Sequence, residues 1–250
     1  MRNDDILFNP NQVSKFSIPY YEIPYDKFFS FGLSVDSVVF GYHQNQLKVL
    51  LIQRGVAPFK GAMALPGDLV YPNETIEVAA RRILKDLTGI DKPFIQQTKV
   101  YSKVDRHPAG RVVTTGVYSI IDIAKYDPHA SAWADGVYWV PIEKCPPLAF
   151  DHDLILQDAY DILRNKVRKE PVGFELLPQK FTLAEFQELY EAILNQKYDK
   201  ANFRKRILST KILKDLDENQ KDVPHRPARL YSFDEEKYKE LKAKGFSIDL

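Results

Sequence analysis

GDLVYPNETIEVAARRILKDLTGI, residues 67–90, contains the strongest helical pattern of the chain. On a helix that begins near residue 73, four apolar side chains fall on one stripe: Ile76, Ala80, Ile83 and Leu87. Gly89 follows as a suitable C-cap. The pattern predicts an amphipathic helix over about 74–87 that packs against the core of a folded domain.

The same stretch resembles a Nudix box, the loop–helix–loop motif Gly-x5-Glu-x7-Arg-Glu-U-x-Glu-Glu-x-Gly-U, in which U is aliphatic. The residues that match the motif are Glu74, Arg82, Leu84, Gly89 and Ile90. Other positions depart from it. Asp68 replaces the first glycine, Ile83 and Leu87 replace carboxylates, and Asp86 keeps one carboxylate.

These departures remove chemistry that a hydrolase of this kind needs. Divalent cations such as Mg²⁺ bind oxygen ligands, and they sit between protein carboxylates and substrate phosphates. The aliphatic side chains of Ile83 and Leu87 cannot bind a cation, and Arg82 and Asp86 can simply pair across one helical turn. We therefore expect no enzymatic activity, no catalytic residue, no metal site and no cofactor.

Composition sets broad limits on the class of protein. The chain has 250 residues, of which 44% are hydrophobic and 28% charged, as in a soluble globular protein of one or two domains. Its net charge of +1 gives no general argument for nucleic-acid binding. The single cysteine, Cys145, excludes an internal disulfide and a cysteine cluster. With no apolar run of membrane-spanning length and no signal-peptide pattern, we expect a cytoplasmic protein.

The order of predicted elements indicates an α/β sandwich followed by a second domain. Strands are expected at 31–41, 47–54, 61–70, 99–104, 111–123 and 137–141, and a closing helix at about 152–168. Prolines and a glycine then end the helical pattern. We predict an arm at 1–30, a degenerate Nudix sensor domain at 31–169, a linker at 170–180 and a DNA-binding domain at 181–250.

The last domain begins with two helices of helix-turn-helix form. Thr182 and Glu185 make a capping box at the start of the first helix. After a turn at 195–198, Asp199 can cap a second helix that ends near residue 209. Its exposed polar face suits DNA, since Arg and Lys contact guanine edges and phosphates and Asn contacts adenine. The predicted DNA-binding residues of this helix are Lys200, Asn202, Arg204, Lys205, Arg206 and Ser209.

A pair of strands after these helices completes the pattern of a winged helix. They are expected at 211–216 and 225–233, and Arg226 and Arg229 would reach phosphates or the minor groove. From residue 197 to 229 there are ten Lys or Arg against five Asp or Glu, a local charge of +5. This concentration is typical of a nucleic-acid-binding surface, although a basic helix face is also common on proteins that bind no DNA.

A degenerate Nudix domain followed by a winged helix resembles the Nudix-related transcriptional regulators of the NrtR/AraR type. The segments that carry the resemblance are the box, Asp105-Arg106 with residues 110–113, residues 150–152, and the stretches GFELLPQKFTLAEFQELYEAI and DKANFRKR. The resemblance implies a homodimer on a palindromic double-stranded operator. It also implies a small effector, which is an ADP-ribose-type nucleotide in one branch and L-arabinose in another. The arabinose branch, with a role in sugar catabolism, looks closer.

The effector site is expected where paired donors, acceptors and cations come together. The candidate effector-binding residues are Glu74, Arg82, Asp105, Arg106 and Arg111. A surface turn with a structural ion pair would also explain Asp105 and Arg106. An N-cap role explains Asp151, and a helix-surface position explains His152.

Two other functions remain open. The first is a Mg²⁺-dependent Nudix hydrolase acting on a nucleoside diphosphate derivative such as ADP-ribose, with a C-terminal domain used for dimerisation. The second is a protein without enzymatic activity that binds a nucleotide and a protein partner. Salt-sensitive, sequence-specific DNA binding distinguishes the regulator from both.

Overall fold

The structure is a computed structural model that describes residues 31–91, 93–170, 172–221, 224 and 226–244. It also describes two short paired strands, β1 (Ser17–Ile18) and β2 (Tyr21–Glu22). Apart from these strands, the arm expected at 1–30 lies outside the described residues. Across the described ranges, no helix is long and apolar enough to cross a membrane.

A seven-stranded sheet forms the first part of the chain, and it is built around one parallel strand pair. Its strands are β3 (Gly32–His43), β4 (Gln46–Arg54), β5 (Met63–Ala64), β6 (Gly67–Leu69), β7 (Gln96–Tyr101), β8 (Val112–Asp122) and β9 (Ala134–Pro141). β3 pairs with β8 in parallel and with β4 and β6 in antiparallel directions. The predicted β3–β4 hairpin is confirmed, with Gln44 and Asn45 at φ 51° and 60°, the left-handed conformation of a tight hairpin turn.

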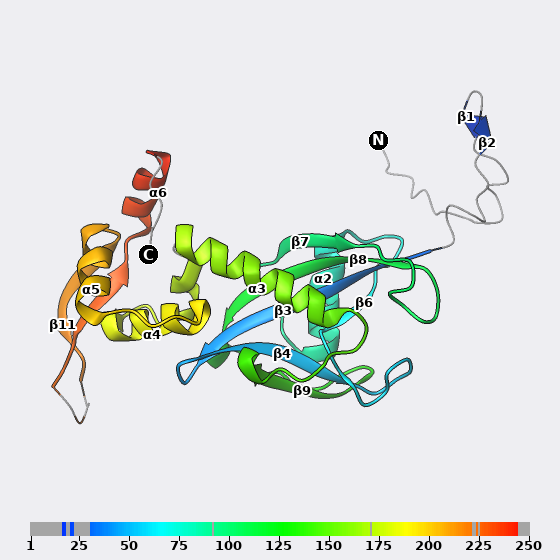
Figure 1. Ribbon diagram of the computed structural model, residues 1–250, viewed down its shortest axis with the longest axis horizontal. Coiled ribbons are helices and arrows are strands. Elements are labelled where there is room, and N and C mark those ends of the chain that lie inside the picture. Colours follow the sequence, from blue (N-terminus) through cyan, green and yellow to red (C-terminus); the bar gives the residue numbers. More distant parts are fainter. Residues whose placement is uncertain are drawn as a thin grey trace, which may run out of the picture.

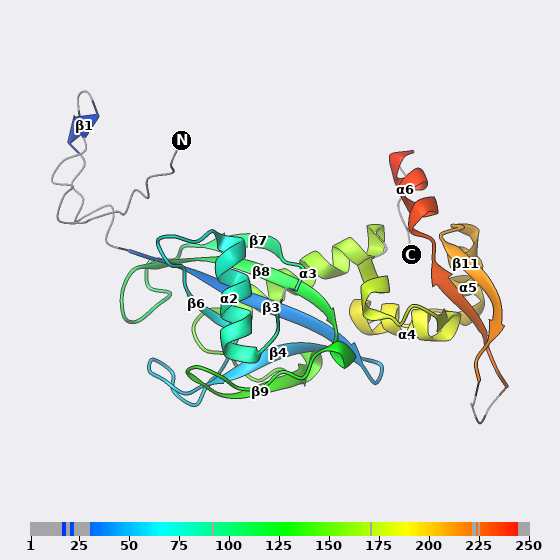
Figure 2. The same cartoon turned by 180° about the vertical axis from the view of Figure 1, so that it is seen from behind.

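Two helices cover opposite faces of this sheet (Figures 1 and 2). They are α2 (Ile76–Thr88) and α3 (His152–Lys169). Because side chains alternate along a strand, Val38 and Phe40 of β3 belong to the core cluster that includes α3. Val35 belongs to the cluster that includes α2. The predicted α/β/α sandwich is therefore confirmed.

The box helix α2 has the apolar face that the sequence predicts. Ile83 and Leu87 are each 1% exposed and lie in a core cluster with strand residues. The Thr75 hydroxyl accepts a hydrogen bond from the backbone N–H of Val78, so the helix starts later than expected. Gly89 ends it at φ 74°, as predicted for a left-handed C-cap.

The C-terminal part is a winged helix. Its elements are η3 (Val172–Leu176), β10 (Phe181–Thr182), α4 (Leu183–Leu194), α5 (Lys200–Ser209), β11 (Leu213–Asn219), β12 (Arg229–Phe233) and α6 (Glu235–Ala243). The three strands form one sheet in the order β10-β12-β11. Both hydrogen bonds of the predicted Thr182–Glu185 capping box are present. The last strand begins at Arg229 rather than at residue 225, which lies outside the described residues.

One hydrophobic cluster extends from the sheet into the winged helix. It contains Phe40 of β3, Leu163 and Val167 of α3, and Phe186 and Tyr190 of α4, each of them fully buried. Leu176 and Leu177, in the segment expected as a linker, are buried in the same cluster. Short 3-10 turns, η1 (Ile123–Lys125) and η2 (Ile142–Lys144), flank β9. Figure 1 shows α3 running from the sheet towards α4.

The buried position of Leu87 gives a test of the box helix. Leu87→Glu restores a carboxylate of the Nudix motif but places an unpaired charge in the core. We expect it to lower the free energy of unfolding by about 3–5 kcal/mol, as measured by urea denaturation. The exposed Asp86→Glu in the same turn is the control and should change stability by less than about 0.5 kcal/mol. Equal stability of the two variants would contradict the buried assignment.

Candidate functional site

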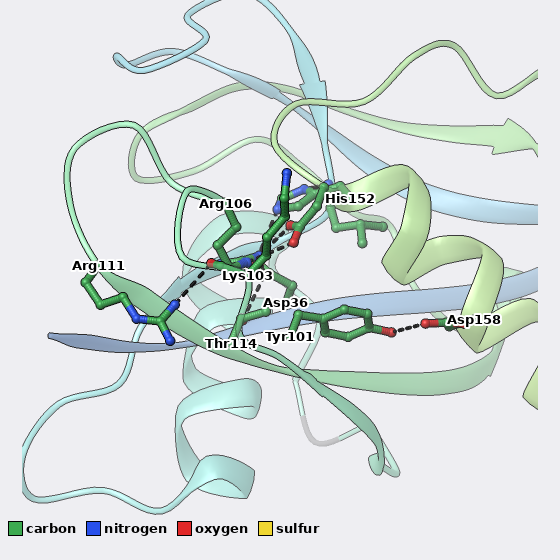
Figure 3. A network of polar contacts seen from close by, with 10 residues as sticks. Asp36, Tyr101, Lys103, Arg106, Arg111, Thr114, His152 and Asp158 are labelled. Carbon is green, nitrogen blue, oxygen red and sulfur yellow. Dashed lines mark hydrogen bonds and ion pairs between the residues drawn. The ribbon is translucent and has the colours of Figure 1, made fainter.

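Arg106 is a buried cation held between two carboxylates (Figure 3). Its Nε and Nη2 donate to the carboxylate of Asp151 at 2.9 and 2.6 Å, and Nη2 also donates to Asp36 at 3.3 Å. Burial alone would lower the pKa of Arg106, but the hydrogen bonds and charges of Asp151 and Asp36 outweigh it and raise the pKa. The guanidinium therefore stays charged although its side chain is only 3% exposed.

Asp36 is the buried acceptor at the centre of this network. Besides Arg106, it accepts from the Thr114 hydroxyl at 2.8 Å and lies 3.4 Å from Nε2 of His152. Nδ1 of His152 accepts from the backbone N–H of Leu65 at 3.0 Å, so Nε2 carries the hydrogen that faces Asp36. Burial raises the pKa of Asp36, but His152, Arg106 and Thr114 together lower it below its usual range.

Asp151 and His152 differ from the roles expected from the sequence. Asp151 is the N-cap residue of α3, but its side chain makes no capping hydrogen bond, because its carboxylate is bound to Arg106. His152 is 3% exposed and belongs to the buried network rather than to the helix surface. Both corrections have one cause: the chain brings a cation and a buried acid to the start of α3.

A pocket of about 630 Å³ opens beside this network. That volume is ordinary for a small-molecule site. Its wall combines cations, carboxylates and rings, and the lining includes Asp36, Arg54, Asp68, Arg106, His107, Arg111, Trp133, Phe150 and His152. Loop residues 56–58 and 109–110 and residues of β3, β6 and β8 complete the wall: Gly32, Ser34, Gly67, Leu69 and Val112.

Arg54 lies between two aromatic rings of the pocket. Its guanidinium carbon is 4.9 Å from the ring centre of Trp133 and 4.9 Å from that of Phe150. Nε of Arg54 donates to the Pro58 carbonyl at 2.7 Å, which fixes the side chain. Phe150 has φ 59°, an uncommon value for an aromatic residue, and its ring stacks on His107 at 5.0 Å. Several contacts thus hold the rings in place.

The structure brings together only part of the predicted effector set. Arg106 and Arg111 line the pocket, and Arg111 also donates to the backbone carbonyls of Ser102 and Lys103. Asp105 is exposed, pairs with Lys103 at 3.2 Å and is not in the pocket lining.

Glu74 and Arg82 lie outside the pocket lining and join the ends of one loop instead. They form an ion pair at 2.5 Å. Arg82 also donates to the Leu69 carbonyl at 2.9 Å, and its guanidinium lies 3.9 Å from the centre of the Tyr71 ring. The expected Arg82–Asp86 pair is the longer contact, at 3.9 Å. The Glu74–Arg82 pair therefore fixes the segment that leads from β6 into α2.

Sequence reasoning missed Asp36, Arg54, Trp133 and Phe150. One signal was available for Asp36, because an acid inside the apolar run LSVDSVVF is unusual for a buried strand. Arg54 ends a buried strand, where a charged residue needs a partner. The two rings lie on loops and carry no periodic signal.

The second helix of the winged helix presents the face that was predicted. Phe203 and Ile207 point inward and are 3% and 0% exposed. Asp199 caps α5 by accepting from the backbone N–H of Asn202 at 2.9 Å. The predicted DNA-contacting side chains of α5 are all exposed: Lys200, Asn202, Arg204, Lys205, Arg206 and Ser209.

Some of the basic side chains that were counted in the wing form ion pairs with carboxylates. Arg229 donates to Asp215 at 2.6 Å and to Asp217 at 3.0 Å. Lys214 lies 3.2 Å from Asp234. Arg226 is exposed at the start of the returning segment. Of the local charge of +5, residues 211–229 contribute only +1, with five Lys or Arg against four Asp or Glu, and residues 197–210 contribute +4. The cations on α5 therefore form the stronger candidate surface.

Two family models match the chain, and they divide it in the same order as the fold. Residues 31–159 match the NUDIX domain, and residues 173–233 match the NrtR DNA-binding winged helix domain. An ADPR responsive transcriptional repressor, NtrR, of Acinetobacter baylyi is 35% identical over 205 residues, which cover 80% of this chain and 81% of that protein. An ADP-ribose pyrophosphatase of Methanocaldococcus jannaschii is 35% identical over 127 residues, which cover 51% of this chain and 72% of that protein.

NrtR of Shewanella oneidensis has a similar structure. Its complex with a 27mer DNA has a TM-score of 0.68 and 29% identity, with 86% of this chain and 96% of that chain covered. Its NUDIX domain in complex with ADP ribose has a TM-score of 0.51 and 32% identity, with 54% and 89% covered. These relatives give no support to the expected closeness to the arabinose branch.

The lowered pKa of Asp36 predicts a pH dependence of stability. Its folded pKa lies below the unfolded value of about 3.9. Its ionisation therefore stabilises the fold above that pH, and this contribution is lost as the pH falls through the folded pKa. We expect the difference in unfolding free energy between the wild type and Asp36→Asn to shrink below about pH 4, measured by urea denaturation at several pH values. A constant difference from pH 7 to pH 3 would contradict the assignment.

Proposed function

The chain belongs to the family of NrtR-type regulators, which join a Nudix domain to an NrtR winged helix, and we propose that it is a DNA-binding transcriptional regulator whose Nudix domain binds ADP-ribose. One observation carries this proposal: a pocket lined by three arginines and two aromatic rings lies in the same chain as an exposed basic helix. The related repressor of Acinetobacter baylyi is ADPR responsive by name.

The chemistry of the pocket fits a nucleoside diphosphate sugar. Guanidinium groups bind phosphate oxygens well, and Arg54, Arg106 and Arg111 all line the cavity. Trp133 offers a ring surface for a base, while Asp68 can accept hydrogen bonds from ribose hydroxyls. A free pentose such as L-arabinose carries no phosphate and would leave Arg54 and Arg111, whose hydrogen bonds in the described residues go to backbone carbonyls, without an anionic partner. ADP-ribose therefore replaces L-arabinose, and with it a role in sugar catabolism, as the proposed effector.

We propose that the Nudix domain does not catalyse hydrolysis. Ile83 and Leu87 replace two carboxylates of the box and are buried in the core. Glu74, a third box position, is held by Arg82 at 2.5 Å and is unavailable to a metal ion in this arrangement. Asp86 remains exposed, and the pyrophosphatase relative keeps hydrolysis of ADP-ribose as the alternative. Incubation of the protein with ADP-ribose and Mg²⁺ tests it, and turnover would overturn the proposal.

DNA binding is proposed through α5, with Arg226 of the wing in support. A recognition helix enters the major groove, and a homodimer would place two such helices on a palindromic operator. Titration of the protein against the promoter DNA of its neighbouring genes at two salt concentrations tests this, with ADP-ribose and L-arabinose added in turn. Specific, salt-sensitive binding that ADP-ribose alone changes is the expected result.

Replacement of a base-reading cation should weaken the complex with the operator. For Arg206→Ala on α5 we expect a loss of about 1–3 kcal/mol in binding free energy, measured by fluorescence anisotropy with labelled operator DNA. Arg229→Ala is the matched control, because Asp215 and Asp217 already hold that guanidinium. A larger loss in Arg229→Ala than in Arg206→Ala would place the main contact on the wing instead.

An aromatic wall of the pocket should contribute to effector affinity. We expect Trp133→Leu to weaken ADP-ribose binding by about 1–3 kcal/mol, as for other base-stacking side chains, in isothermal titration calorimetry. Phe94→Leu is the control, since Phe94 is 65% exposed and is not in the pocket lining. Unchanged affinity in Trp133→Leu would place the base elsewhere.

A further inference from the structure

Helix α3 has one end in the pocket and the other beside the DNA-binding helices. It begins directly after Asp151, whose carboxylate is bound to the pocket residue Arg106. Its length of 18 residues corresponds to about 27 Å. Figures 1 and 2 both show the helix passing from the sheet to α4. It is therefore a direct physical connection between the two candidate sites.

In the second half of α3, two side chains hold the end of α4. The Tyr160 hydroxyl donates to the Ile193 carbonyl at 2.9 Å, and Nη2 of Arg164 donates to the Leu194 carbonyl at 3.2 Å. The last carbonyls of a helix have no partner within it, so these contacts fix the point where α4 ends. The next helix along the chain is α5, which starts at Lys200. We call the contacts of Tyr160 and Arg164 with α4 the α3–α4 latch.

At the pocket end, Asp151 has two competing roles. It is the N-cap residue of α3 and has a side chain suited to capping, but its carboxylate is bound to Arg106 and makes no cap. Arg106 lines the pocket and is already shared between Asp36 and Asp151. A phosphate group in the pocket would compete with Asp151 for the same guanidinium. The released carboxylate could then accept from the backbone N–H of Asp153, because the N–H groups of His152 and Leu154 already donate to the carbonyls of Ala149 and Asp151.

We propose that α3 couples the pocket to the DNA-binding helices: a ligand phosphate on Arg106 releases Asp151 to cap α3, and the resulting shift of the helix acts on α4 through the latch. This inference rests on the proposed function. Coupling of this kind requires that the ligand bind the two arrangements with different affinity. The exchange of partners at Arg106 supplies that difference, since only the ligand-bound arrangement leaves Asp151 free.

The middle of α3 is tied to the sheet, which limits how the helix can move. Asp158 accepts from the Tyr101 hydroxyl at 3.0 Å and from Lys99 at 2.7 Å, and Figure 3 shows the first of these contacts. A change at the first turn would therefore make α3 tilt or rotate about this contact rather than slide along the sheet. The latch lies beyond the contact, at residues 160 and 164, where such a motion changes the end of α4.

The test separates ligand binding from its effect on the operator. Full-length wild type, Tyr160→Phe and Arg164→Met are compared by operator titration with and without saturating ADP-ribose, and by calorimetry with ADP-ribose alone. In the wild type we expect ADP-ribose to change the operator dissociation constant by roughly 5- to 150-fold. In both latch variants, the ratio of the operator dissociation constants with and without ADP-ribose should fall at least about fivefold. The affinity for ADP-ribose itself should stay within about twofold of the wild type, because neither residue lines the pocket.

Asn165→Ala provides the control on the same helix turn, because Asn165 is exposed. It should keep the ratio of the wild type. If ADP-ribose binds and both latch variants also keep that ratio, the coupling through α3 is overturned, even when their thermal stability is reduced. If ADP-ribose does not bind the wild type, the proposed function fails and the coupling with it.

Discussion

The burial of the Arg106 guanidinium constrains the first domain more than any other single interaction described. Removal of a charged group from water costs several kcal/mol, so it must be paired. The two carboxylates come from β3 and from the residue before α3, and Asp36 in turn accepts from Thr114 of β8 and lies beside His152. One cation thereby fixes the position of a loop relative to a central strand pair and a covering helix. The pocket opens at this junction because its wall is already rigid and polar.

The parts of the structure that the sequence predicts are those with local causes. The Thr182–Glu185 capping box, the Gly89 cap and the Gln44-Asn45 turn depend on neighbours within a few positions, and each was found as expected. The apolar stripe of the box helix is equally local. The pocket network has a different origin, because Arg106 lies 70 positions from Asp36 and 45 positions from Asp151. No periodicity links such residues, and only the fold brings them together.

Charge shows the same division between local pattern and spatial arrangement. The exposed face of α5 followed from helical spacing alone. The ion pairing in the wing did not follow from the sequence. Arg229 and Asp215 lie on adjacent strands, 14 positions apart, and their pairing depends on the register between β11 and β12. A count of charged residues along the sequence treats paired and unpaired cations alike. In this winged helix the pairing of Arg229 leaves the exposed face of α5 as the stronger candidate DNA surface.

The hydrophobic cluster shared by the sheet, α3 and α4 has a consequence for modularity. Residues such as Leu163 and Phe186 belong to one buried cluster rather than to separate cores. Either half expressed alone would expose this surface to water, so the two halves should unfold in a single cooperative transition. A chimaera that joins this Nudix domain to an unrelated reader would therefore need to carry α3 and its partner helix together. Exchange of sensors between such proteins is constrained by packing at the junction rather than by the length of the connecting segment.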